Sequence, residues 1–98
     1  MKEEGAVYRV MVDDNYHYMD ESERYELGAY TTREAAVAAA RAVVDAFLLG
    51  ARRPGMTAEA LYTQYVTFGE DPFIVGPAGE AGLFSAWDYA RARCAEMT

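Results

Sequence analysis

The sequence is poor in cysteine, histidine and basic residues. Its 98 residues include one cysteine, one histidine, and nine Lys and Arg against sixteen Asp and Glu. A single cysteine, Cys94, excludes an internal disulfide and a pair of zinc-ligand cysteines. One histidine and one distant cysteine, without an HxH or HExxH pattern, are too few soft ligands for a transition-metal site. We therefore expect no metal and no other cofactor.

Positive charge and long apolar runs are scarce as well. The formal net charge is −7, and a field of this sign repels phosphate backbones and anionic lipid. The longest apolar-biased run, residues 35–49, contains two charged residues and is shorter than a membrane span. The N-terminal stretch MKEEGAVYRVMV has no apolar segment of signal-peptide length. The sequence therefore predicts a cytoplasmic protein that binds neither nucleic acid nor membrane.

The hydrophobic and aromatic content of the chain is typical of one globular domain. Hydrophobic residues make up 52% of the chain and aromatic residues 13%, which lies outside the range of disordered proteins. A chain of 98 residues is too short for two cores. We expect a single domain over residues 1–98. Glycine-rich phosphate loops are absent, because GPAGEAG has neither the GxGxxG spacing nor a lysine.

Alternating side chains predict two strands near the N-terminus. Residues 6–12, AVYRVMV, alternate with one face suited to a core. Residues 24–30 repeat the pattern, and here we expect Tyr25, Leu27 and Ala29 to point inward. Two such segments in succession most simply form an antiparallel pair.

The capping-box spacing of Thr31-Thr32-Arg33-Glu34 predicts that a helix over residues 32–49 begins after Thr31. This segment is rich in alanine, and Gly50 is a natural helix stop. The alanines would let the helix lie close to the sheet.

The C-terminal half predicts further elements. Thr57 can cap a helix over residues 58–65, although YTQYVTF also has the β-branched and aromatic content of a strand. GEDP is predicted as a turn, followed by the short strand FIVG. Ser85 with Asp88 predicts a last helix over residues 86–96, with Trp87 and Cys94 on its buried face. The order β-β-α-(α)-β-α predicts an α+β fold, a two-layer sandwich with helices covering a small antiparallel sheet.

The connection between the first two strands is the most unusual segment. DDNYHYMDESERY, residues 13–25, gathers five acids, three tyrosines and the only histidine. The connection of eleven residues, 13–23, exceeds the usual hairpin loop of about 2–5, and such loops are often functional. FGEDPF, residues 68–73, has a similar mixture of rings and acids. The sequence alone does not say whether the two segments are neighbours.

Metal and acid–base chemistry are two interpretations of this loop. The spacing of Asp13, Asn15 and His17 matches the start of an EF-hand, but Tyr18 replaces the required glycine and Arg24 the bidentate glutamate. A looser divalent-metal site is the weaker alternative, with candidate ligands Asp13, Asp14, Asp20 and Glu21. A small enzyme or metal-dependent hydrolase would use His17 as a proton shuttle with Asp13 or Asp20.

Recognition of another protein is the interpretation that we favour. Tyrosine buries a large ring at an interface and keeps a hydrogen bond, and surrounding acids suit a basic partner. We expect a non-enzymatic interaction module whose candidate contact residues are Tyr16, His17, Tyr18, Met19, Asp20 and Glu21. An acidic mimic of nucleic acid ranks last, because the acids form one cluster instead of a phosphate-like series.

Three stretches resemble a group of short, uncharacterised bacterial proteins. They are VDDNYHYMDESERYELGAY, YTQYVTFGEDPFIV and FSAWDYARARC, and the resemblance would cover most of the chain. The resemblance implies a bacterial origin. It carries no activity, cofactor or site residue to this chain.

Overall fold

The computed structural model describes residues 7–17 and 21–98, without the side chains of His17 and Glu21. The elements are β1 (Tyr8–Asp14), the short 3-10 helices η2 (Asn15–His17) and η3 (Glu21–Glu23), β2 (Tyr25–Tyr30), α1 (Arg33–Ala51), α2 (Ala58–Phe68), β3 (Glu70–Val75) and α3 (Ala86–Met97). The predicted α+β fold and its order of elements are confirmed. The ambiguous segment before β3 is a helix.

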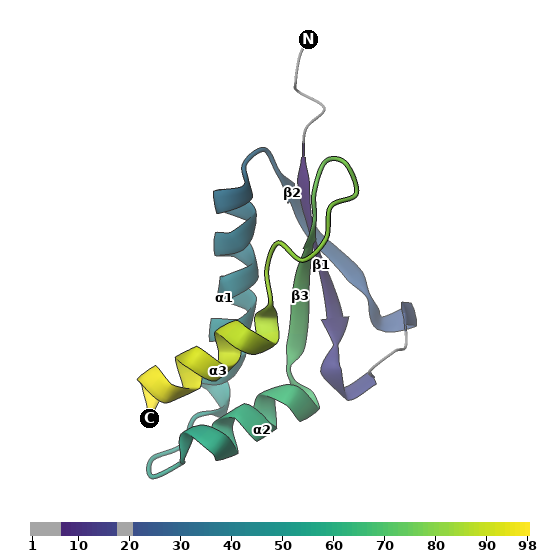
Figure 1. The fold of residues 1–98 in the computed structure, drawn as a ribbon. Helices are drawn as coiled ribbons and strands as arrows, with labels where there is room; N and C mark the ends of the chain where they lie inside the picture. Colours follow the sequence, from purple (N-terminus) through teal and green to yellow (C-terminus); the bar gives the residue numbers. More distant parts are fainter. Residues whose placement is uncertain (1–6, 18–20) are drawn as a thin grey trace.

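The three strands form one antiparallel sheet in the order β2-β1-β3. Figure 1 shows α1 and α3 on the same side of the sheet, with α2 crossing beneath its lower end. Helices therefore cover one face, as predicted for a two-layer sandwich. No helix in the described part of the chain is long and apolar enough to cross a membrane.

The predicted inward face of β2, formed by Tyr25, Leu27 and Ala29, is observed only in part. Val10, which is fully buried, pairs with Gly28, and the register then shifts so that Met11 pairs with Glu26. Because residues directly opposite each other share a face of the sheet, Gly28 lies on the core side, and Ala29, opposite the exposed Arg9, faces away from it. Beyond the bulge, Tyr25 pairs with the buried Val12 and lies on the core side again, although it is 43% exposed. Alternation shows which residues share a face, but pairing and the bulge decide where that face points.

The predicted turn GEDP is also wrong, because β3 begins at Glu70. Pro72 pairs with Val12 and is fully buried. Proline lacks a backbone donor, so it is tolerated in β3 because this is an edge strand with only β1 beside it. Pairing with β1 thus overrides the local turn signal of these residues.

The ends of α1 differ slightly from the prediction. The N-cap is Thr32 instead of Thr31, since the Thr32 hydroxyl accepts a hydrogen bond from the backbone N–H of Ala35 at 3.1 Å. The helix continues through Gly50 to Ala51. Beyond it, the guanidinium of Arg53 donates to the carbonyls of residues 50, 51 and 52 at 3.0–3.3 Å, which satisfies acceptors left free at a helix end.

Two hydrophobic clusters form the core. One lies between the helices and contains Val44, Leu48, Leu61, Tyr65, Ala86, Ala90 and Cys94. The other joins α1 to the sheet through Val10, Ala36, Ala40 and Ile74. Cys94 is buried as predicted, but Trp87 is 38% exposed and Ala86 takes the buried position instead. The predicted Ser85 cap of α3 is confirmed by its bond to the N–H of Asp88 at 3.2 Å.

Candidate functional site

The predicted loop leaves β1 beside the end of α2 and the start of β3. The Asn15 side chain, only 7% exposed, donates to the carbonyl of Tyr65 at 3.0 Å. The Asn15 backbone N–H donates to the carbonyl of Gly69 at 2.9 Å. Since β3 also pairs with β1, FGEDPF and the start of the loop are neighbours in space.

Two exposed aromatic rings stack at this junction. The Tyr16 backbone N–H donates to the carboxylate of Asp14 at 2.9 Å. The rings of Tyr16 and Phe68 are stacked at an interplanar angle of 22° with their centroids 5.5 Å apart, and the two residues are 63% and 52% exposed. We call these two rings the aromatic platform. Sequence analysis predicted Tyr16 but not Phe68, although the similarity of FGEDPF to the loop was a signal for it.

Carboxylates face each other across the strand pair at this end of the sheet. Asp13 lies opposite Asp71, and Asp14 lies opposite Glu70. Like charges directly opposite in a sheet are destabilising. Arg24 neutralises one of them, because its guanidinium donates to both carboxylate oxygens of Asp13, at 2.6 and 3.1 Å.

Asp71 has no ion-pair partner among the described residues. Burial, and secondly the charge of Asp13, raise the pKa of the Asp71 carboxyl to about 6. The residue borders a hollow of about 370 Å³ that is also lined by Phe73, Phe84 and Trp87. The Arg24 guanidinium lies 5.1 Å from the centre of the Phe73 ring. A carboxylate beside aromatic rings is an environment that attracts a cationic side chain.

Glu70 is held by neighbouring tyrosines. The Tyr25 hydroxyl donates to the Glu70 carboxylate at 3.1 Å, and the buried Tyr65 hydroxyl donates to its backbone carbonyl at 2.6 Å. Burial, and then the proximity of Glu70, raise the pKa of Tyr25. Tyr25 is therefore a hydrogen-bond donor at neutral pH and fixes the Glu70 carboxylate in place.

Negative charge dominates this part of the molecule, which we call the acidic end. It consists of the described residues 13–17, 21–25 and 69–71, whose described charged side chains are Asp13, Asp14, Glu23, Arg24, Glu70 and Asp71. Five acids thus accompany one base. Such an imbalance favours encounters with a positively charged partner.

Several predicted contact residues lie outside the described part of the chain. These are Tyr18, Met19 and Asp20, together with the side chains of His17 and Glu21. The catalytic pairing of His17 with Asp13 or Asp20, and the metal set Asp13, Asp14, Asp20 and Glu21, therefore remain predictions.

Two observations concern those alternatives directly. Asp13 and Asp14 are consecutive residues of β1, so their side chains leave opposite faces of the sheet. Among the side chains described, no group of three or more His, Cys, Asp or Glu residues could hold a metal ion. Because Arg24 engages both oxygens of Asp13, this carboxylate would first have to leave that ion pair to act as a base.

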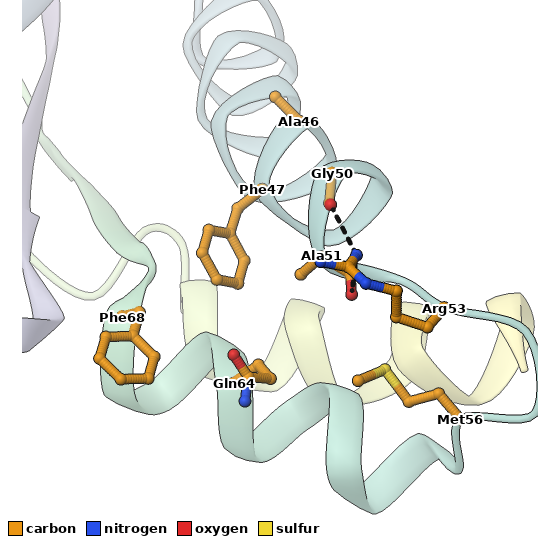
Figure 2. Close-up of a pocket in the computed structure, with 8 residues that line it drawn as sticks. All are labelled: Ala46, Phe47, Gly50, Ala51, Arg53, Met56, Gln64 and Phe68. Carbon is orange, nitrogen blue, oxygen red and sulfur yellow. Dashed lines mark hydrogen bonds between the residues drawn. The ribbon is translucent and has the colours of Figure 1, made fainter.

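A second surface, not predicted from the sequence, lies along α1. It consists of two adjoining hollows that share Ala46 and Phe47, and we call them together the trough. One hollow, of about 690 Å³, lies between α1 and β2 and includes Leu27 and Tyr30. The other, of about 540 Å³, lies between α1 and α2, and Figure 2 shows Phe47, Phe68, Gln64 and Met56 around it.

Comparisons of the chain with protein-family models, with curated proteins and with solved structures found no match. The function must therefore be argued from the two surfaces themselves.

Proposed function

We propose that this protein is a non-enzymatic interaction module that binds a basic protein partner through its acidic end. The observation that carries the proposal is the exposed aromatic platform beside carboxylates that outnumber their basic neighbours. Tyr16 and Phe68 are more than half exposed, yet they are stacked in a fixed geometry. Rings held in this way bind a partner with little further loss of conformational freedom.

The carboxylates would set the charge of the partner. Asp71 has a raised pKa and no ion-pair partner within the described residues, so a contacting Lys or Arg would stabilise its ionised form. The same cation would lie near Phe73 and Trp87 in the hollow beside Asp71, where cation–π attraction adds to the ion pair. A basic side chain therefore fits this hollow better than an acidic or an apolar one.

The fold explains how such a site is tolerated. Facing carboxylates on β1 and β3 weaken the sheet by fractions of a kcal/mol per pair, up to about 1 kcal/mol. The Asn15 anchor and the Arg24–Asp13 ion pair hold the same strands together. We place the module in the cytoplasm of a bacterium, which agrees with a chain whose lone cysteine is buried.

The proposal is tested by affinity capture from a bacterial lysate at low and high salt. Wild-type protein is expected to recover a basic partner, with less recovery at high salt because surface charges are screened. The Tyr16→Ala, Phe68→Ala double variant and the Asp71→Asn variant are expected to lose that partner.

Leu49→Ala is the matched control, since Leu49 is 59% exposed on α1 but lies outside the acidic end. This variant is expected to recover the partner as well as wild type does. Equal recovery by wild type and by the double variant would show that the aromatic platform does not bind the partner. Recovery of only acidic proteins would show that the carboxylates do not select a basic partner.

A further inference from the structure

β2 is an edge strand whose outer side is unpaired. The strand order is β2-β1-β3, so β2 has a neighbouring strand on one side only. No backbone hydrogen bond reaches residues 25–30 from any described element other than β1. Alternate residues of an edge strand direct their N–H and C=O groups away from the sheet. These groups form a template for another strand, about 20 Å long for six residues.

The two edges of the sheet differ in how they discourage such pairing. β3 contains Pro72, which has no N–H and limits pairing at that edge. β2 contains neither proline nor lysine, the residues that commonly protect an exposed edge. Its only charged side chain, Glu26, is engaged by Arg9 of β1 at 3.3 Å. The edge formed by β2 is therefore the more open of the two to an added strand.

The part of the trough between α1 and β2 gives the side chains of an added strand a place to pack. This hollow of about 690 Å³ is lined largely by apolar residues, among them Leu27 and Tyr30 of β2 and Val43 and Phe47 of α1. Figure 1 shows that β2 diverges from α1 toward the start of the strand. Because successive side chains of a strand point to opposite faces, every second side chain of an added strand faces this hollow, and apolar ones match its lining.

Charges along β2 favour a basic partner and one direction of the added strand. Glu70 lines the same hollow near the start of β2, where the Tyr25 hydroxyl donates to its carboxylate at 3.1 Å. Among the described residues no Lys or Arg forms an ion pair with Glu70. Beyond the other end of β2, Arg33 begins α1. A cation of the partner is therefore favoured at the start of β2 and disfavoured at its end.

We infer that an extended segment of a partner protein adds to β2 as a fourth, antiparallel strand. Its apolar side chains fill the hollow between α1 and β2, and a Lys or Arg at its C-terminal end pairs with Glu70. Antiparallel pairs are slightly more stable than parallel ones, and this direction places the C-terminal end of the segment at the start of β2. The contact extends the proposed function to a second surface, and it does not depend on the aromatic platform.

An extended segment fits this surface better than a helix or a second copy of the chain. A helix in the hollow would leave the outer N–H and C=O groups of β2 without a protein partner, whereas a strand pairs with them. A second copy would offer its own β2, whose only charged residue is Glu26. That strand brings no cation to Glu70, and two chains of net charge −7 repel each other.

Binding of a designed peptide tests the inference. The probe consists of three Val-Thr repeats followed by two lysines, with blocked termini and a fluorescent label, and its binding is followed by fluorescence anisotropy. We expect saturable binding to wild type, and slower amide hydrogen exchange in residues 25–30 of the complex. The matched control peptide carries N-methyl groups on two consecutive central residues, and one of these groups replaces a donor that faces β2. It is expected to bind about tenfold more weakly.

Two lysine variants locate the binding surface. Leu27→Lys places a charge in the hollow beside β2 and is expected to weaken peptide binding by about tenfold or more, because apolar side chains lose their contact there. Leu49→Lys is the matched control, since Leu49 is 59% exposed on α1 and lies outside the lining of the hollow. It should bind as wild type does, and circular dichroism should show both variants folded. Glu70→Gln should remove most of the salt dependence of binding.

Four results would overturn the inference. They are the absence of saturable binding, equal binding of the two peptides, equal binding by Leu27→Lys and Leu49→Lys, and a wild-type dimer in light scattering that Leu27→Lys converts to a monomer. The last result would assign the edge to a second copy of the chain. The Tyr16→Ala, Phe68→Ala variant is expected to bind the peptide as wild type does. Failure of strand addition and failure of the aromatic platform are therefore separate outcomes.

Discussion

Replacing Asp71 with asparagine is expected to stabilise the free protein at neutral pH while weakening its binding to a basic partner. The substitution keeps the size of the side chain and removes the negative charge that lies opposite Asp13 across the β1–β3 pair. The reasoning predicts a conflict between stability and function at this position. Such conflicts are common where a site holds like charges close together.

The magnitude follows from the carboxyl pKa. Burial first, and then the Asp13 charge, raise the pKa of Asp71 from 3.8 to about 6. Because the folded protein holds this proton more tightly than the unfolded chain does, stability falls as the pH rises from about 4 to about 6, and the loss is complete above the folded pKa. At about 1.36 kcal/mol per pH unit, the upper limit is about 3 kcal/mol. Water screens this partly exposed group, so we expect about 1–1.5 kcal/mol.

Urea unfolding near pH 4 and near pH 7.5, followed by circular dichroism, measures this effect. Asp71→Asn should be more stable than wild type near pH 7.5, and the difference should vanish near pH 4. Glu80→Gln, which removes a charge from an exposed loop, is the control and should change stability little at either pH. A variant that is no more stable than wild type near pH 7.5, or a gain that is equal at both pH values, would refute the argument.

Three further substitutions test the supports of the site by the same urea-unfolding assay. Asn15→Ala should lower the free energy of unfolding by about 1–2 kcal/mol, since it removes a buried hydrogen bond to the Tyr65 carbonyl; a loss near zero would mean that the loop is not anchored there. Thr32→Ala should lower it by about 1 kcal/mol through loss of the N-cap, whereas an equal effect of Thr31→Ala would contradict the cap assignment. Gly69→Ala should lower it by about 1–3 kcal/mol, because the new Cβ would lie 2.6 Å from the Tyr65 ring and 2.8 Å from its carbonyl oxygen; unchanged stability would show that Tyr65 can move aside.

The first and last helices, α1 and α3, were predictable because their signals are local, whereas α2 was left open between helix and strand. A capping side chain acts within one turn of its own helix, as Ser85 does for α3. The fold class followed from the order of strands and helices, because a hairpin with helices after it must bury one face of its sheet. The shift of the α1 cap by one residue arose because Thr31 and Thr32 can each serve as a cap.

The predictions that the structure contradicts concern features that depend on contacts between distant segments. GEDP has turn-forming residues, and only its pairing with β1 makes it a strand. The inward face of β2 depends on the bulge opposite Val10 and Met11. Trp87 is partly exposed because Ala86 fits between the helices of the core cluster. In each of these cases tertiary packing outweighs a local preference.

Part of the candidate site was predictable from the sequence. The length, acids and tyrosines of the loop indicated it as a candidate site, and Tyr16 is exposed. The partner of that ring, Phe68, and the Asp71 carboxylate, which has no ion-pair partner among the described side chains, come from a segment more than 40 positions away. Their proximity depends on the β1–β3 register, which no local pattern encodes.

The sequence by itself determined a small acidic α+β domain with capped helices and a buried cysteine, because composition, periodicity and capping act over a few residues. Only the tertiary structure decided which carboxylates face each other, which exposed rings stack, and which side of α1 the other described elements leave uncovered. Those features depend on strand register and on the rotation of a helix against its neighbours, and both are set by the packing of the whole domain.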